Sequence, residues 1–121
     1  NHSGNCRGRK LMNFDEYQAA AVATAIYPEE WSVIYPALGL GNEAGEVQGK
    51  IKKQLRDGIL GEPATDEQKK ELAKEIGDVL WYCAALARDL GINLDTIAQW
   101  NIQKLQDRQQ RGVIGGSGDN R

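Results

Sequence analysis

Apolar residues recur at spacings of three and four along most of the chain, and almost no segment alternates strictly between polar and apolar positions. This periodicity places apolar side chains on one face of a helix, whereas a half-buried strand repeats every second residue. The sequence therefore predicts an all-α domain. We expect four helices, over about residues 14–26, 36–56, 66–90 and 94–110.

Residues that cap or stop helices flank these segments. An N-cap side chain accepts a hydrogen bond from the first turn, and a proline or glycine after the last turn ends the helix. The expected N-caps are Asn13, Thr65 with its capping-box partner Gln68, and Asn93. The expected stop signals are Tyr27-Pro28, Asp57-Gly58 and Gly91. Pro36 suits the first turn of the second helix, where a proline gives up no helical hydrogen bond.

The four helices are expected to form one domain over residues 12–112, which is too short to divide into two cores. The polar decapeptide NHSGNCRGRK lacks the apolar stretch of a secretion signal. We interpret residues 1–11 as a disordered extension or a cloning remnant, with Met12 as the native start. Residues 113–121 form a Gly-rich C-terminal tail, for which a loop is expected.

One histidine and two cysteines limit the available chemistry. His2 lies at the chain start, so Ser-His-Asp and Cys-His mechanisms and His-rich zinc or di-iron sites are disfavoured. Cys6 and Cys83 are far apart and form no C-x-x-C pattern, which argues against a disulfide framework and favours a cytoplasmic protein. Catalysis would then depend on carboxylates, Lys, Tyr or a metal held by oxygen.

The charge balance is slightly acidic, because 15 Lys and Arg face 17 Asp and Glu for a net charge of −2. That balance argues against general binding to nucleic acid, which requires many cations against the phosphate backbone. No run of eighteen apolar residues is present, so no membrane span is expected. A small anionic substrate remains compatible, since a metal ion can supply positive charge.

Two acidic pairs occupy the second and third expected helices: Glu43 with Glu46, and Glu75 with Asp78. At this i, i+3 spacing each pair lies on one helix face, where both carboxylates can contact one cation. Random placement of 17 acidic residues would give roughly two such pairs, so spacing alone does not separate a site from a solvated face. The surroundings are more informative, because Asp78 precedes VLWYCAALA, a stretch without any charge.

Helical projection places both acidic pairs beside the apolar faces of their helices. If the two helices pack antiparallel, the carboxylates face one another, and a divalent cation is the simplest relief of their repulsion. Because every candidate ligand is oxygen, Mg²⁺ or Mn²⁺ is favoured over Zn²⁺, and Mg²⁺ is the expected ion. The predicted metal ligands are Glu43, Glu46, Glu75 and Asp78.

The fourth helix carries Asn101, Lys104 and Arg108 on one face. This face is either the basic edge of an ordinary amphipathic helix or a binding edge for a polyphosphate. Lys53, on the second helix, would assist the anion or form a salt bridge with Glu46. The glycines Gly41, Gly45 and Gly49 recur every four residues and favour close helix packing, within one subunit or between subunits.

The segments GNEAGEV and EIGDVLWY, which hold the two acidic pairs, resemble the MazG-like nucleoside triphosphate pyrophosphohydrolases. That family has two glutamates three apart on one helix, then Glu and Asp three apart on the next. The segment LARDLGINL and the ending KLQDRQQRGVIGGSGDNR also resemble it, and the ending is similar to a phage and bacterial branch. The resemblance extends from about Met12 to the C-terminus.

The resemblance implies a four-helix MazG-like bundle completed by oligomerisation, as a homodimer or homotetramer. It implies that Mg²⁺ is bound by the four carboxylates and that a (d)NTP is cleaved to (d)NMP and pyrophosphate. A glutamate would orient or deprotonate the attacking water; Glu46 is our choice, and Glu43 the other candidate. The implied nucleotide contacts are Tyr82, Asn101, Lys104 and Arg108.

Base recognition and the tail leave alternatives open. Trp31 and Tyr35 either stack on the base or fill the core. The tail either closes over the phosphates, through Asn120 or Arg121, or is disordered. Our leading hypothesis is an enzyme of nucleotide-pool control or house-cleaning, with a purine substrate such as dGTP as a refinement. The alternatives are a dUTP or dCTP pyrophosphatase on the same scaffold and a noncatalytic helical adaptor that dimerises.

Overall fold

The computed structural model describes residues 11–59 and 64–121, and all regular structure in those residues is helical. The predicted all-α class and the four predicted α-helices are therefore confirmed. The interpretation of residues 1–10 as an extension lies outside the described residues. The elements are α1 (Phe14–Val22), the 3₁₀ turn η2 (Glu29–Trp31), α2 (Ile34–Arg56), α3 (Asp66–Asp89) and α4 (Leu94–Gln110).

Two of the predicted N-caps form complete capping boxes. The Asn13 side chain accepts from Glu16 N at 2.8 Å, and the Glu16 carboxylate accepts from Asn13 N at 3.0 Å. Thr65 and Gln68 make the same reciprocal pair at 3.1 and 2.9 Å before α3. Each box satisfies amides that the first helical turn leaves without a partner.

The first helix was predicted to reach residue 26, which is wrong, because α1 ends at Val22. A continuing helix would have Ala25 N–H donate to the Ala21 carbonyl. That carbonyl instead accepts from Thr24 Oγ1 at 2.7 Å and from Trp81 Nε1 at 3.2 Å. Ala25 N–H donates to Val22 O, and the chain leaves the helix four residues early.

Asn93 is the N-cap residue of α4, but its side chain makes no capping hydrogen bond, contrary to the prediction. Side chains of α1 instead accept hydrogen bonds from the first amides of α4. Gln18 Oε1 accepts from Leu94 N at 3.0 Å, and Asp15 Oδ1 accepts from Asp95 N at 3.2 Å. The start of α4 is therefore fixed by tertiary contacts with α1.

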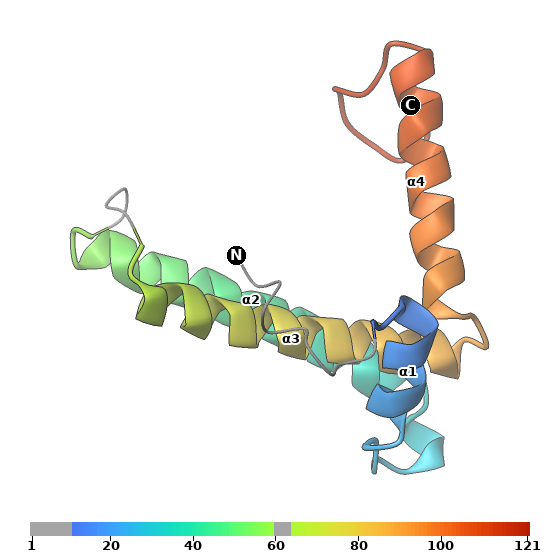
Figure 1. Cartoon of the computed structure of the whole chain (residues 1–121), viewed down its shortest axis with the longest axis horizontal. Coiled ribbons are helices and arrows are strands. Elements are labelled where there is room, and N and C mark those ends of the chain that lie inside the picture. The colour runs from blue at the N-terminus through green and yellow to red at the C-terminus, as the bar shows by residue number, and fades with distance from the viewer. Residues whose placement is uncertain (1–10, 60–63) are drawn as a thin grey trace.

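The helices are arranged as a long hairpin with an arm. Figure 1 shows α2 and α3 side by side along most of their length, with α1 against the C-terminal end of α3. Helix α4 leaves that end at a steep angle and carries the C-terminal tail at its distant end. The four helices thus do not close into a bundle within one chain, and completion of the bundle by oligomerisation stays a prediction.

The core lies where α1, α3 and α4 meet. It is built mainly from small residues, which let the helices approach closely: Ala21, Ala84, Ala87 and Leu94. Gln18 is buried among them and donates from Nε2 to the carbonyls of Ala84 and Ile92, each at 3.2 Å. One side chain therefore links three helices through their backbones.

Much apolar surface remains exposed outside this core. Large apolar side chains at least 57% exposed include Ile34, Leu38, Leu55, Ile76 and Trp100. Where such side chains form a contiguous patch, the patch usually marks an association face. Among residues 11–59 and 64–121, none of the helices could serve as a membrane span.

The glycines of α2 differ in what they permit. A Cβ on Gly41, Gly45 or Gly49 would meet no described atom within 4 Å, so these glycines do not serve packing within the subunit. The alternative, packing between subunits, stays a prediction. A Cβ on Gly39 would instead collide with the ring of Tyr82, so the close approach of α3 requires the glycine there.

Candidate functional site

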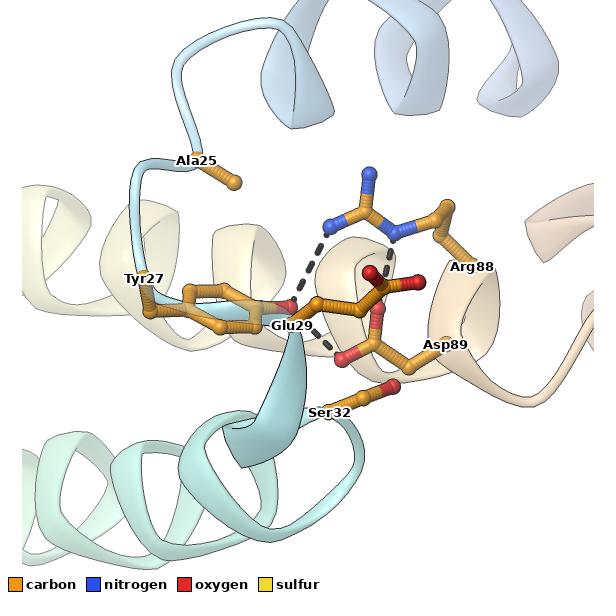
Figure 2. A pocket seen from close by; sticks show the side chains of 6 residues that line it. All are labelled: Ala25, Tyr27, Glu29, Ser32, Arg88 and Asp89. Carbon is orange, nitrogen blue, oxygen red and sulfur yellow. Dashed lines mark hydrogen bonds and ion pairs between the residues drawn. The ribbon is translucent and has the colours of Figure 1, made fainter.

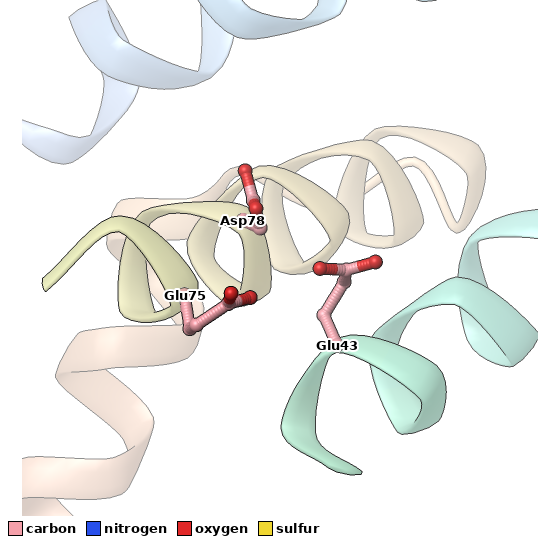
Figure 3. Close-up of side chains that lie close together, drawn as sticks. All are labelled: Glu43, Glu75 and Asp78. Atoms are coloured by element: carbon pink, nitrogen blue, oxygen red, sulfur yellow. The ribbon is translucent and has the colours of Figure 1, made fainter. Parts of the chain in front are cut away.

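Three of the four predicted metal ligands converge between α2 and α3. One carboxylate oxygen from each of Glu43, Glu75 and Asp78 lies within 4.8 Å of the others, and Figure 3 shows these side chains gathered from the two helices. The i, i+3 spacing puts Glu75 and Asp78 on one face of α3, and the antiparallel hairpin brings Glu43 opposite. We call these three residues the carboxylate cluster.

The fourth predicted ligand, Glu46, lies outside the cluster. It is exposed on α2, one turn after Glu43. Lys50, four residues after Glu46 on α2, pairs across the hairpin, with its ammonium 3.6 Å from Glu75 and 3.7 Å from Glu71. Lys53 is exposed and has no ion pair in the described part of the chain.

The carboxylate cluster is short of positive charge. Of the three cluster residues, Glu75 alone has an ion pair, with Lys50, and within residues 11–59 and 64–121 no Lys or Arg forms an ion pair with Glu43 or Asp78. Three neighbouring carboxylates repel one another unless a cation or a proton lies between them. An oxygen-only donor set at this spacing suits a hard divalent cation such as Mg²⁺ or Mn²⁺.

A pocket of about 400 Å³ opens beside the cluster and is lined by Glu43, Asp78, Trp81 and Tyr82. Tyr82 was predicted from the resemblance, and it lies against the Gly39 backbone on one wall. Burial raises the pKa of its phenol, and Tyr35 and the carboxylate charges raise it further, so the hydroxyl stays neutral. Trp81 was not predicted, although it adjoins Tyr82 in the uncharged stretch after Asp78.

A second pocket, of about 290 Å³, continues from the same two side chains and is mainly aromatic. Its ring system consists of Tyr27, Trp31, Tyr35, Trp81 and Tyr82, and we call it the aromatic pocket. The predicted stacking residue Trp31 is half exposed and stacks on Tyr35, with ring centroids 5.7 Å apart at 24°. A planar group held there would lie beside the carboxylate cluster, because Trp81 and Tyr82 line both pockets.

The predicted phosphate-binding residues lie on α4, which projects away from the α2–α3 hairpin in Figure 1. Asn101 is exposed there. Lys104 Nζ lies 3.1 Å from Asp119 Oδ1, and buried Arg108 donates to the same oxygen at 3.2 Å. Lys104, and then Arg108, lower the pKa of Asp119. Within one chain, the basic residues of α4 therefore lie away from the carboxylate cluster.

The C-terminal tail is folded back on α4, in contrast to the disordered alternative. The Asp119 contacts hold the tail two residues before its end, and Arg121 Nε donates to Val113 O at 3.2 Å. Gly116 and Gly118 adopt positive φ angles of 95° and 84°, which allow the chain to turn back. The tail does not close over the carboxylate cluster of its own chain, because it lies at the far end of the arm in Figure 1.

Sequence reasoning also missed Asp89, an acid with a buried side chain at the last position of α3. Its side chain is 4% exposed and accepts from Tyr27 Oη at 2.7 Å, from Val33 N at 2.9 Å and from Arg88 Nε at 2.7 Å. Figure 2 shows the Tyr27 hydroxyl between Arg88 and Asp89, in a pocket of about 440 Å³. A carboxylate at a helix C-terminus interacts unfavourably with the helix dipole, so its presence there indicates that other groups stabilise it. This position was the signal in the sequence that could have identified Asp89.

Comparison with known proteins places these features in a family. Residues 36–113, which include both helices of the carboxylate cluster, match the model of the MazG nucleotide pyrophosphohydrolase domain. The chain is 48% identical over 118 residues to the Gene 37 protein of Mycobacterium phage L5, covering 91% of this chain and 100% of the phage protein. No solved structure matches. The chain therefore belongs to the MazG nucleotide pyrophosphohydrolase family, as its acidic motifs predicted.

Proposed function

We propose that this protein is a Mg²⁺-dependent nucleoside triphosphate pyrophosphohydrolase that converts a (d)NTP to (d)NMP and pyrophosphate. The observation that carries the proposal is the carboxylate cluster, in which Glu43, Glu75 and Asp78 meet from two helices within 4.8 Å. Membership of the MazG nucleotide pyrophosphohydrolase family supports the same reaction class. The proposed role is nucleotide-pool control or house-cleaning, with a purine dNTP such as dGTP as a candidate substrate.

The cluster suits a divalent cation in its chemistry and its charge. Glu43, Glu75 and Asp78 would hold Mg²⁺, with Mn²⁺ able to substitute, because hard cations prefer carboxylate oxygen. When bound, such a cation neutralises triphosphate charge and lowers the pKa of nearby water. Glu46 joins the ligand set in this proposal or acts as the base, since it is exposed one turn from Glu43.

The reaction requires a water, a base and a leaving group. Glu46, or Glu43 in its place, takes a proton from the water while the water oxygen forms a bond to the α phosphorus. The bond between the α phosphorus and the bridging oxygen breaks, and pyrophosphate leaves with the electron pair. Lys53, exposed on α2, would neutralise charge on the departing group.

The aromatic pocket supplies a place for the base. Trp31 and Tyr82 would contact it there, because aromatic faces stack on any nucleobase. Asn101, Lys104 and Arg108 would contact the phosphates from a second subunit, because α4 points away from its own carboxylate cluster. The proposed assembly is a homodimer or homotetramer that covers the exposed apolar residues of α2 and α4.

The test is a product analysis with canonical and modified NTPs and dNTPs in the presence of Mg²⁺. We expect monophosphate and pyrophosphate, and we expect Asp78→Asn to reduce turnover by more than about 100-fold, beyond the loss typical of an outer-shell change. Glu67→Gln, an exposed acid on the same helix, is the matched control and should retain full turnover. Diphosphate with phosphate as products, full activity in Asp78→Asn, or no turnover by the wild type would refute the proposal, and the last would favour a noncatalytic adaptor.

A further inference from the structure

The link between η2 and α2 has a backbone conformation that its residue does not favour. Val33 has φ 68° and ψ −50°, and Ile34 N–H donates to Ser32 O at 2.7 Å, which closes a γ-turn of the rare strained hand. A positive φ is unusual for a β-branched residue, and in residues 11–59 and 64–121 every other positive φ belongs to glycine. Contacts from elsewhere in the fold must hold this turn in place.

Asp89 provides the outside contact that holds the turn. Its Oδ2 accepts from Val33 N at 2.9 Å and from Tyr27 Oη at 2.7 Å, while its Oδ1 accepts from Arg88 Nε at 2.7 Å. Because α3 is a long, regular helix and the carboxylate is buried, this acceptor has a fixed position. The hydrogen bonds join the segment before η2, the turn after it and the end of α3.

The segments that Asp89 joins carry the outer wall of the aromatic pocket. Trp31 precedes Val33 by two residues and Tyr35 follows it by two, and their stacked rings face each other across the turn. Tyr27 contacts Tyr35 with ring centroids 4.9 Å apart. A single carboxylate therefore fixes the backbone between two of the rings and the hydroxyl of the third.

We propose that Asp89 is a positioning residue for the nucleotide base, which acts by holding the Val33 turn and Tyr27 so that the aromatic pocket is preformed beside the carboxylate cluster. Asp89 touches neither the base nor the reacting phosphates in this arrangement. The inference rests on the proposed function, since it assigns the aromatic pocket to the base of the same substrate. It predicts that loss of Asp89 affects binding and base preference more than the chemical step.

The first test is Asp89→Asn. An asparagine amide has one acceptor oxygen, so either the Val33 and Tyr27 donors or the Arg88 donor would face an NH₂ group. We expect KM to rise about tenfold, the loss typical of one base–aromatic stack, with kcat within about threefold of wild type and with weaker discrimination between bases. An unchanged KM, or a fall in kcat alone, would overturn the proposal.

Rescue separates positioning from a general loss of structure. Val33→Gly lets the turn adopt positive φ without an outside acceptor. The double variant Val33→Gly with Asp89→Asn should therefore have a KM close to that of the wild type. A KM as high as that of Asp89→Asn alone would count against the proposal. Asp57→Asn is the matched control and should leave KM unchanged, because Asp57 is exposed and, among residues 11–59 and 64–121, pairs with adjacent Arg56 alone. If Asp89→Asn does not fold, Tyr27→Phe is the milder variant, with an expected rise in KM of about threefold.

A measurement without nucleotide or metal distinguishes this inference from the proposed function. The Trp31–Tyr35–Tyr27 stack should give a near-ultraviolet circular dichroism signal that weakens in Asp89→Asn and returns in the double variant, with helix content unchanged throughout. Loss of this signal in Asp89→Asn and its return in the double variant support the positioning of the rings, even if the wild type hydrolyses no nucleotide. The absence of hydrolysis would refute the proposed function alone. A signal unchanged in Asp89→Asn would overturn the inference even in an active enzyme.

Discussion

An Arg-Asp dipeptide stands at the C-terminal end of each of the two long helices, but its aspartate has different surroundings in the two places. At the end of α2, Arg56 Nε lies 2.9 Å from Asp57 Oδ1, and at the end of α3, Arg88 Nε lies 2.7 Å from Asp89 Oδ1. The side chain of Asp57 is 52% exposed, whereas that of Asp89 is 4% exposed. The local ion pair is nearly the same, and the surroundings are not.

The difference lies in what each carboxylate contacts beyond its neighbouring arginine. Asp57 faces water, where solvent screens the pair and leaves it a small contribution to stability. Asp89 accepts from Tyr27 and Val33, which are 62 and 56 residues away along the chain. A buried charge is tolerated only when it is saturated with donors, so the fold depends on those distant partners. Adjacent residues form the Arg-Asp ion pair in both helices, and tertiary contacts determine how much the aspartate contributes to stability.

The largest expected effect is on stability, from removing each aspartate in turn. Asp89→Ala leaves the Tyr27 hydroxyl and the Val33 amide without their acceptor, and should lower the free energy of unfolding by about 2–4 kcal/mol. Asp57→Ala should change it by less than about 0.5 kcal/mol. Chemical denaturation of both variants measures the comparison. Equal effects would show that burial at Asp89 adds nothing to the shared ion pair.

The same contrast explains how far the sequence could predict the candidate site. The i, i+3 spacing beside an uncharged stretch correctly brought Glu43, Glu75 and Asp78 together, because helical periodicity and antiparallel packing are enough to place them. The spacing could not tell that Glu46 lies outside the cluster, since that depends on the rotation of α2. The role of Asp89 depends on a turn 56 residues away, which no local pattern encodes.

The fold shows the same limit. The caps at Asn13 and Thr65 are local and were predicted correctly. The early end of α1 depends on Trp81, and the start of α4 depends on Gln18, both reached only after the chain folds back. The predicted bundle was one completed by oligomerisation, and within one chain these contacts direct α4 away from the hairpin.

The second expected effect is acid sensitivity at Asp89. Burial alone would raise the pKa of this carboxyl, but hydrogen bonds from Tyr27, Val33 N–H and Arg88 outweigh it and lower the pKa below its usual value. A lowered folded-state pKa stabilises the fold above the ordinary Asp value of about 3.9, and this contribution is lost as pH falls through the folded-state pKa. The stability gap between wild type and Asp89→Asn should therefore stay constant from about pH 7 to about pH 5 and narrow as pH falls from about 5 to about 3.

The control for that experiment is Asp57→Asn, because the pair at the end of α2 is exposed. Its stability gap from wild type should stay near zero across the same pH range. Taking differences from wild type also cancels the acid response of Asp119 and Glu71, whose pKa values are lowered by Lys104 and Lys74 respectively. A gap for Asp89→Asn that does not depend on pH would contradict the assigned cause.

A smaller effect is expected from the hydroxyl of Tyr27. Tyr27→Phe removes one of the three donors to Asp89 and keeps the ring against Tyr35, so it should cost about 1 kcal/mol of stability. Tyr17→Phe is the matched control, because the Tyr17 hydroxyl has no hydrogen bond in the described part of the chain, and it should change stability by less than about 0.5 kcal/mol. Thermal unfolding of the two variants side by side measures the difference. Equal values would show that Asp89 is satisfied without Tyr27.

The smallest expected effect is the most specific test of the turn that Asp89 holds. Val33→Gly releases backbone strain of about 1–3 kcal/mol, but it adds about 0.4–1 kcal/mol of unfolded-state entropy and removes a partly exposed side chain. These terms nearly cancel, so the variant should remain within about 1 kcal/mol of wild type. Val47→Gly in the middle of α2 has no strain to release and should be clearly destabilising, by more than about 1 kcal/mol. A loss at Val33 as large as that at Val47 would mean that the turn stores no strain, and that Asp89 differs from Asp57 by burial alone.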